Sequence, residues 1–350
     1  IRTIIITYFR SSSFNCHSMC PQQYFCEYVL GWRGKGGLKA DKGTIVHKVL
    51  EIMCLAKKAE QDGLKHFDDD VVGKVSASSY DIDKITEQVY KYYSEGNPQH
   101  DWKQRDFNDC SKWVYKTLEM NDGMFDPRNR DVVDAEPHFD FEIDEEWAKY
   151  DYMLNGERVT GKLAMKGTID LITKVDEGFY EIVDWKTGRR LDWATGQEKT
   201  YAKLQNDPQL RIYHYAATKL YPEAKQIMVT INFINDGGAF SMYFSEKDIP
   251  KTKKMLKNKF EKIKSTHIPL LKKSWKCKSF CHQGKSTFEG TNIHPIIEHR
   301  HGQRTSYGEY MTKCEQIKYE IERKGIEKVT EEYMAEGHNV AKYKAPGSLE

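Results

Sequence analysis

Apolar and polar residues alternate with a period close to two in the middle of the chain, which is the pattern of β-strands. Valine, isoleucine, tyrosine and phenylalanine are frequent there, and these residue types favour strands. Five segments show the pattern: His138–Ile143, Leu163–Val175, Phe179–Trp185, Ile227–Ile234 and Phe240–Phe244. We therefore expect five strands in this part of the chain.

Segments before and after these strands have the period of helices, close to 3.6 residues. A strongly periodic helix is predicted for Thr44–Ala56, after two shorter helices that begin near Ser11 and at Cys20-Pro21. Another helix, Asp207–Leu220, lies between the third and fourth strands and has a proline in its first turn. Strands with flanking helices imply the α/β (α+β) class.

Four segments of the chain differ in composition: residues 1–65, 66–133, 134–250 and 251–350. The first holds the N-terminal helices. The second is a polar and aromatic helical insertion, with helices expected at Ile85–Tyr93 and Trp113–Met120. The third holds the strands. The fourth has a basic helix and a cysteine-containing C-terminal region with a last helix at Tyr310–Arg323. Together they are expected to form one domain.

The composition is that of a soluble globular protein, because 39% of the 350 residues are hydrophobic and 30% are charged. No apolar run is long enough to span a bilayer, and Ile4–Ile6 are too few for a signal peptide. We therefore expect no membrane partner and an intracellular location, either cytoplasmic or, for a phage-encoded protein, in the host cytoplasm.

The net charge of +2 conceals a local excess of positive charge. Ten lysines and one acid lie between Lys251 and Lys276. Such a patch suits a polyanionic partner. A solvated helix face has the same composition, so the charge alone leaves both interpretations open.

The third predicted strand ends in Asp184-Trp185-Lys186. Side chains alternate along a strand, so Asp184 and Lys186 project to one side and Trp185 to the other. Taken alone, the pair is more often an edge ion pair than half of a metal site. The preceding strand, however, would bring Asp170 beside Asp184, and two neighbouring carboxylates repel unless a cation lies between them.

At these positions the sequence resembles the RecB-like PD-(D/E)xK nucleases. The motifs follow the family's order: Ser-Ser-Ser-Phe with Cys20-Pro21, Gly-Thr-Ile-Val-His47, Gly-Thr-Ile-Asp170, Asp184-Trp-Lys186-Thr-Gly and Gln209-x-x-x-Tyr213. Each motif is weak alone, whereas the ordered set is specific. The resemblance covers most of the chain except residues 66–133 and 282–308. It implies a restriction-endonuclease-like core in which helices flank a central mixed sheet.

The resemblance also implies a site for Mg²⁺ or Mn²⁺. Its ligands would be His47, Asp170, Asp184 and the backbone carbonyl of Trp185. Lys186 would orient or deprotonate the attacking water, or offset the charge that develops on the phosphate. We therefore expect Lys186 to face the water and the phosphate rather than to neutralise Asp184. Gln209 would position water or phosphate, and Tyr213 would brace the site.

The eight cysteines of an intracellular protein are not expected to form a disulfide framework. Some members of the resembled family carry a 4Fe–4S cluster, held by one cysteine before the histidine motif and three after the nuclease core. The matching residues are Cys20, Cys277, Cys281 and Cys314. Cys16 is the alternative fourth ligand, with His282 behind it. Cys16 would form two Cys-x₃-Cys pairs, which also suit Zn²⁺.

The resulting prediction is a divalent-metal-dependent DNA exonuclease that acts in recombination, repair or replication. Lys253, Lys254 and Lys257 are expected to contact the DNA backbone, and Trp275 to stack on bases. The alternatives are a non-catalytic DNA-binding or assembly module that keeps the nuclease fold, and an RNA or structure-specific nuclease. The sequence lacks a Gly-x₄-Gly-Lys-Ser/Thr loop, so unwinding would require a helicase or recombination partner.

Overall fold

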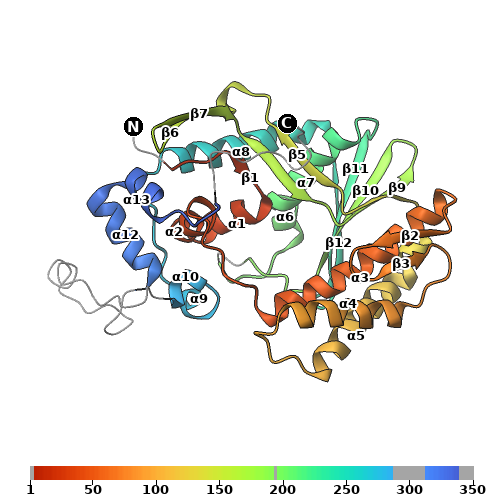
Figure 1. The fold of residues 1–350 in the computed structure, drawn as a ribbon. Coiled ribbons are helices and arrows are strands. Elements are labelled where there is room, and N and C mark those ends of the chain that lie inside the picture. The colour runs from red at the N-terminus through yellow and green to blue at the C-terminus, as the bar shows by residue number, and fades with distance from the viewer. Residues whose placement is uncertain (1–3, 193–194, 287–311, 339–350) are drawn as a thin grey trace. The chain divides into compact units, whose positions relative to one another are not determined.

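The structure is a computed structural model that describes residues 4–192, 195–286 and 312–338. The chain forms two compact units, each assembled from separate stretches of sequence (Figure 1). The central unit comprises residues 36–139 and 167–252, and the terminal unit comprises residues 1–35, 140–166 and 253–350. The predicted four-segment division follows the order of the chain instead, and it stays a prediction.

The central unit is built on a five-stranded mixed sheet in the order β12-β11-β10-β9-β4. Its strands are β4 (Val132–Ala135), β9 (Leu171–Asp176), β10 (Phe179–Lys186), β11 (Gln226–Phe233) and β12 (Gly238–Phe244). β10 and β11 are parallel, and the other neighbours are antiparallel. Parallel neighbours need a crossover connection, which contains α6 (Tyr201–Leu204) and α7 (Pro208–Leu220).

Three helices and a small hairpin complete the central unit: α3 (Leu38–Gln61), α4 (Ile82–Gly96), α5 (Gln104–Gly123), β2 (His66–Asp69) and β3 (Gly73–Ser76). Figure 1 shows α3, α4 and α5 packed alongside one another. The apolar stripe of α3 joins Val183 and Trp185 of β10 in one buried core. Since alternate strand residues share a face, this core positions Asp184 on the opposite face of the sheet.

The terminal unit is mainly helical. Its elements are β1 (Tyr8–Phe9), α1 (Ser11–Met19), α2 (Pro21–Tyr24), the π-helical turn Phe25–Val29, β6 (Lys149–Leu154), β7 (Glu157–Lys162), α9 (Trp275–Ser279), α10 (His282–Lys285), α12 (Lys313–Lys324) and α13 (Ile326–Tyr333). Three elements run from one unit into the other: β5 (His138–Glu142), β8 (Ala164–Thr168) and α8 (Ile249–Lys264). β1, β8 and β5 form a three-stranded sheet.

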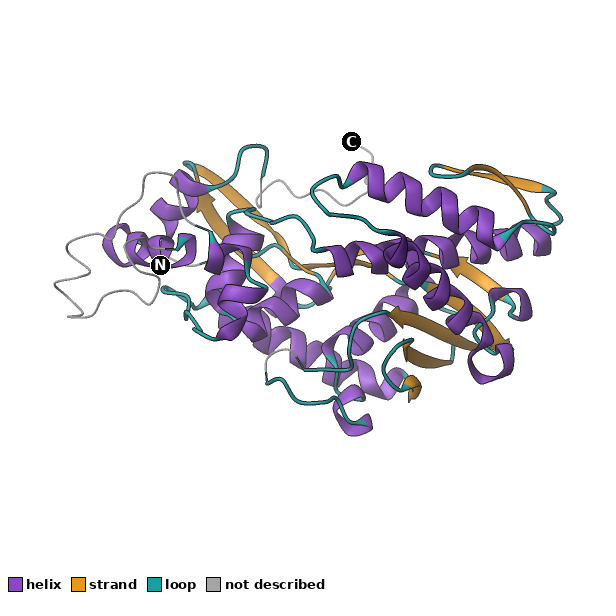
Figure 2. Ribbon diagram, turned by 90° about the horizontal axis from the view of Figure 1, so that it is seen from below, coloured by secondary structure: helices purple, strands orange, loops and turns teal. Residues whose placement is uncertain are grey.

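Figure 2 shows the mixture of helices and strands by colour. The predicted α/β (α+β) class, with a central mixed sheet flanked by helices, is confirmed. The insertion of residues 66–133 is not wholly helical, because it also contains β2 and β3. These short strands, like β4 and β7, are too polar or too brief to show a period of two. β6 does alternate, with Tyr150, Tyr152 and Leu154 on its more buried side, although it was not among the predicted strands. The region between residues 287 and 311 lies outside the described residues.

The prediction of one strand over Leu163–Val175 is wrong. The segment forms β8 and β9, which belong to different sheets. Gly167 lies so close to the Phe139 ring that a Cβ would come within 2.5 Å of it. Beyond Gly167, the Ile169 amide donates to the Pro137 carbonyl at 3.2 Å, and the chain then pairs with β10. This change of partner places Asp170 at the break.

No helix among residues 4–192, 195–286 and 312–338 combines the length and the apolar character that crossing a membrane requires.

The buried ion pair between Arg130 and Glu181 of β10 provides a test of this packing. The Glu181 side chain is 5% exposed and also accepts a hydrogen bond from Thr230 at 2.6 Å. Arg130→Met would leave a buried carboxylate without its cation, so it should lower the free energy of unfolding by about 3–5 kcal/mol. The urea midpoint, followed by circular dichroism, measures this loss.

Lys174→Met is the matched control, because Lys174 of β9 pairs with the exposed Glu177 in the turn between β9 and β10. The urea midpoint of this variant should not move measurably. Equal shifts in the two variants would contradict a special contribution of the buried pair.

Candidate active site

Asp184 and Lys186 lie at the end of β10. Asp184 is fully buried, and the Lys186 Nζ lies 2.8 Å from its Oδ2 and 2.9 Å from its Oδ1. The Trp185 side chain is buried in the core with α3 instead, as strand alternation predicts. The ion pair that the sequence left as the alternative is therefore present, although Lys186 also lines an open pocket.

Asp170 comes directly before β9, the hairpin partner of β10. Val183 pairs with Leu171 in antiparallel register, so Asp170 and Asp184 occupy neighbouring positions on adjacent strands. The Asp170 Oδ2 accepts a hydrogen bond from the Trp185 backbone amide at 2.8 Å. This bond fixes the orientation of the Asp170 carboxylate relative to the end of β10.

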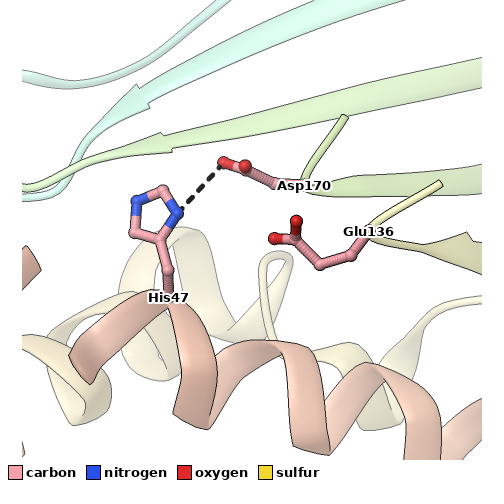
Figure 3. A group of neighbouring side chains, drawn as sticks. All are labelled: His47, Glu136 and Asp170. Atoms are coloured by element: carbon pink, nitrogen blue, oxygen red, sulfur yellow. Dashed lines mark ion pairs between the residues drawn. The ribbon is translucent and has the colours of Figure 1, made fainter. Parts of the chain in front are cut away.

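His47 of α3 and Glu136 converge on Asp170 (Figure 3). The His47 Nδ1 lies 3.6 Å from the Asp170 Oδ2. One possible ligand atom from each of the three side chains lies within 4.8 Å of the others. Among the described residues, no other set of three His, Cys, Asp or Glu side chains meets this criterion. Two carboxylates and one imidazole form a donor set that suits a divalent cation.

Glu136 was not among the residues predicted from the sequence. It lies in the turn after β4 with a φ of +51°, a left-handed conformation that few residues other than glycine adopt. Its amide donates to the Asp170 carbonyl at 3.0 Å. Strain of this kind persists where the surroundings over-determine it, and such sites are often functional. The sequence signal was only an acidic residue before Pro137, where the pattern changes to strands.

Gln209 and Tyr213 share one face of α7, as their spacing predicts. The Asp207 side chain caps this helix by accepting from the Gln209 amide at 2.9 Å, and so fixes its first turn. The Gln209 Nε2 donates to the Tyr213 hydroxyl at 2.9 Å and to the Asp184 Oδ1 at 3.4 Å. Gln209 and Lys186 together therefore hold the Asp184 carboxylate.

The carboxylates of the site destabilise one another's charged forms. Burial, and then repulsion from Asp170 and Glu51, raise the pKa of Glu136 to about 8. Burial raises the pKa of Asp184 to about 6, in spite of the opposing Lys186 charge. A cation among these oxygens would relieve the repulsion, so the charge balance fits a bound metal ion.

The remaining groups are stabilised in their charged forms. Burial acts against the Asp170 carboxylate, but His47 and Lys186 outweigh it, and the pKa of Asp170 is lowered. Burial also acts against the charged forms of His47 and Lys186. The negative charge of Asp170 outweighs burial at His47, so the pKa of His47 is raised. The negative charge of Asp184 makes the largest contribution that outweighs burial at Lys186, so the pKa of Lys186 is also raised. Lys186 is therefore an ammonium at neutral pH.

These side chains line a pocket of about 430 Å³ in the central unit. His47, Glu136, Asp170 and Lys186 lie on its wall, together with Tyr93 of α4. Tyr93 belongs to the insertion of residues 66–133, for which the sequence indicated no function. The insertion thus contributes to the wall of the candidate site as well as to the core.

The predicted cluster cysteines Cys20, Cys277, Cys281 and Cys314 lie in the terminal unit as free thiols. Burial raises the pKa of Cys281 to about 11 and that of Cys314 to about 12, and the Cys20 sulfur adds to both shifts. Cys20, Cys281 and Cys314 are thus close enough to interact. The Cys277 thiol instead donates to the Lys272 carbonyl at 3.7 Å.

Two further thiols belong to the same neighbourhood. Burial raises the pKa of Cys16 and of Cys26 above the ordinary range, and Cys20 and Cys281 contribute to both shifts. Within the described residues, no three of these sulfurs lie within 4.8 Å of one another.

The residues predicted to bind DNA lie on α8 and α9. Lys253 pairs with Glu145 at 2.6 Å, Lys257 lies 3.7 Å from Glu261, and Lys254 is exposed. Trp275 is 58% exposed at the start of α9. Their role in binding stays a prediction.

The sequence matches the family model of the PD-(D/E)XK nuclease superfamily over residues 11–283, so the chain belongs to this superfamily. Membership places it among the hydrolases that act on phosphodiester bonds, and implies that it binds nucleic acid. No curated protein matches the sequence.

Two solved structures are similar to the chain. The crystal structure of a candidate exonuclease from Eubacterium rectale aligns with a TM-score of 0.41 and 10% identity, over 74% of this chain and 79% of that chain. The crystal structure of SSO0001 aligns with a TM-score of 0.25 and 15% identity, over 65% of this chain and 90% of that chain.

Glu136→Gln should stabilise the metal-free protein at alkaline pH. The folded-state pKa of about 8 lies above the ordinary value of 4.5. The stability contributed by this group is thus fully present below about pH 4.5 and is lost as the pH rises through 8. In EDTA near pH 9 the variant should gain on the order of 2 kcal/mol after allowance for solvent screening.

Thermal melting curves of the two proteins across this pH range measure the gain. The curves should coincide near pH 4.5, where both side chains are neutral. Glu177→Gln, at the exposed β9–β10 turn, is the control and should show no such gain. An alkaline melting temperature that Glu136→Gln leaves unchanged would rule out the inferred repulsion.

Proposed function

We propose that the chain is a divalent-metal-dependent DNA exonuclease of the RecB-like branch, acting in recombination, repair or replication. The observation that carries the proposal is the convergence of His47, Glu136 and Asp170 beside the Asp184–Lys186 pair. A non-catalytic module would have no need to keep this strained and mutually repulsive arrangement. Family membership supplies the phosphodiester substrate class.

The residues that would hold Mg²⁺ or Mn²⁺ are His47, Asp170 and Glu136. Asp184 and the Trp185 carbonyl complete the set inferred from the resemblance. Glu136 is added here because its carboxylate lies with His47 and Asp170, whereas Asp184 is engaged by Lys186 and Gln209. When bound, the cation supplies Lewis-acid polarisation of the scissile phosphate and lowers the pKa of a water molecule.

Lys186 would act as a fixed positive charge. Its raised pKa keeps it protonated at neutral pH, so it suits stabilisation of negative charge on the phosphate better than removal of a proton from water. Asp184 holds the ammonium in place from the buried side. Gln209 and Tyr213 would orient Asp184 through the hydrogen bonds described above.

Lys186→Ala should lower the rate of DNA degradation by roughly 10²–10⁴-fold, because it removes a charge that stabilises the transition state. His47→Ala and Asp170→Asn should abolish metal-dependent activity, and EDTA should do the same for the unmodified protein. The assay is digestion of 5′- and 3′-labelled single-stranded DNA, duplex DNA and RNA with Mg²⁺ or Mn²⁺.

Lys225→Ala is the matched control, since Lys225 is an exposed lysine whose amide binds Gly178, just before β10 and at the end away from Lys186. It should keep full activity. A Lys186→Ala protein that still degrades DNA in Mg²⁺ would contradict the proposal. Cleavage of RNA alone, or of internal bonds alone, would reassign the substrate or the mode of attack.

We also propose that Cys20, Cys277, Cys281 and Cys314 hold a 4Fe–4S cluster in the terminal unit, with Cys16 as the alternative fourth ligand. Electrostatic interaction among the Cys20, Cys281 and Cys314 sulfurs supports three of the four proposed ligands. The cluster would join α1–α2 to the C-terminal helices as a structural cross-link.

Protein purified without oxygen should be brown, with visible absorption and about four irons per chain. Cys281→Ser should lose both, whereas Cys54→Ser, a fully buried thiol of the central unit, should keep them. Comparing Cys314→Ser with Cys16→Ser identifies the fourth ligand. Colourless protein with stoichiometric zinc would exclude the cluster.

A further inference from the structure

Two lysines of the terminal unit, Lys259 of α8 and Lys272 in the segment that follows it, contact the end of α1. Lys262 comes three residues after Lys259 and so lies on the same side of α8. The Lys259 Nζ donates to the Ser18 Oγ at 2.8 Å, and the Lys272 Nζ donates to the Ser18 carbonyl at 2.9 Å. Two ammonium groups are thus held at one residue, and Lys262 adds a third charge nearby.

No carboxylate among the described residues lies within 4.0 Å of Lys259, Lys262 or Lys272. Three other lysines of the same segments have carboxylate partners: Lys253 with Glu145, Lys257 with Glu261, and Lys273 with Glu315. The C-terminal end of α1 offsets only about half a charge. Roughly two and a half positive charges therefore stay uncompensated.

The surroundings of Lys259 show the same imbalance. Its ammonium lies 4.3 Å from the centre of the Phe14 ring and is half-buried. Burial, and then the charges of Lys262 and Lys272, lower the pKa of Lys259 to about 8. A bound anion would reverse this effect, because an opposite charge favours the ammonium form.

An aromatic pair follows Lys272 by a few residues. Trp275 and Phe280 are 58% and 62% exposed, and their ring centres lie 5.3 Å apart in an edge-on arrangement. Exposed aromatic side chains are the surfaces on which proteins stack the bases of single-stranded nucleic acid. Unpaired bases stack on such rings, whereas the bases of a duplex are already stacked on one another.

We propose that Lys259, Lys262 and Lys272 bind successive backbone phosphates of single-stranded nucleic acid, and that Trp275 and Phe280 stack on its bases. The proposal rests on the proposed function only for the class of ligand. It differs from the sequence prediction, since the paired Lys253 and Lys257 are replaced by lysines without carboxylate partners. The backbone of a nucleic acid carries a row of phosphates, and such a row suits three ammonium groups better than a single small anion would.

The test is fluorescence anisotropy with a labelled oligothymidylate and with a duplex of the same length, both in EDTA so that no hydrolysis occurs. The triple variant Lys259→Gln, Lys262→Gln, Lys272→Gln should bind the single strand at least about tenfold more weakly. The slope of log affinity against log salt should fall by about 2, since each lost phosphate contact contributes about 0.7 for single strands.

The matched control is Lys253→Gln, Lys257→Gln, Lys273→Gln, which removes the same total charge from the same elements. The decrease in log affinity of this control should be less than half of the decrease in the first triple variant, because its three lysines already have carboxylate partners. Trp275→Ala with Phe280→Ala should weaken single-strand binding by about tenfold and leave duplex binding unchanged. Equal losses in the two triple variants would overturn the lysine site.

Stronger binding to duplex than to oligothymidylate would overturn the assignment to single strands. Binding to vesicles of anionic phospholipid in preference to the oligonucleotide would overturn it in favour of a membrane surface. Failure of the nuclease proposal is recognised separately. Hydrolysis of bis(p-nitrophenyl) phosphate with Mn²⁺ reports the pocket of the central unit, and both triple variants should hydrolyse it at the unmodified rate.

Discussion

The hydrogen bond from the Trp185 amide to the Asp170 carboxylate ties the candidate site to the sheet. It forms only because β9 and β10 pair in a register that sets Leu171 opposite Val183. That register depends in turn on the burial of Val183 and Trp185 against α3, since a slip by one residue would reverse every side chain of the strand. Core packing and site geometry are thus one constraint, and α3 also delivers His47.

The site concentrates like charges that the protein alone does not neutralise. Lys186 and Gln209 hold Asp184, and His47 faces Asp170, while Glu136 keeps a raised pKa and a left-handed backbone. A fold selected only for stability would replace such a group. The arrangement is understandable if a cation completes the charge balance, and this also explains why the donors come from three separate segments.

The terminal unit has the opposite imbalance, an excess of positive charge around Ser18 beside a group of buried thiols. Lys253 and Lys257 of α8 have carboxylate partners, whereas Lys259 and Lys272 both donate to Ser18, and this is the place where we propose that an external anion binds. The pKa values of the buried Cys281 and Cys314 thiols are raised first by burial and then by neighbouring thiols, and both residues are among the ligands that the proposed cluster would use. In both units, like charges lie close together, and local packing does not explain why they do so.

The sequence by itself determined the class of the fold, four of the five expected strands, and that Asp184 and Lys186, like Gln209 and Tyr213, share a face, because a period of two or 3.6 and a spacing of two or four residues are local properties. It did not determine the ion pair between Asp184 and Lys186, since Lys186 was expected to face water and phosphate instead. Tertiary structure alone decided that Leu163–Val175 breaks at Asp170, and that Glu136 turns into the site. It also decided which lysines find carboxylates, as with Lys253 and Glu145. Those outcomes depend on contacts between residues far apart in the chain, and no local pattern encodes such contacts.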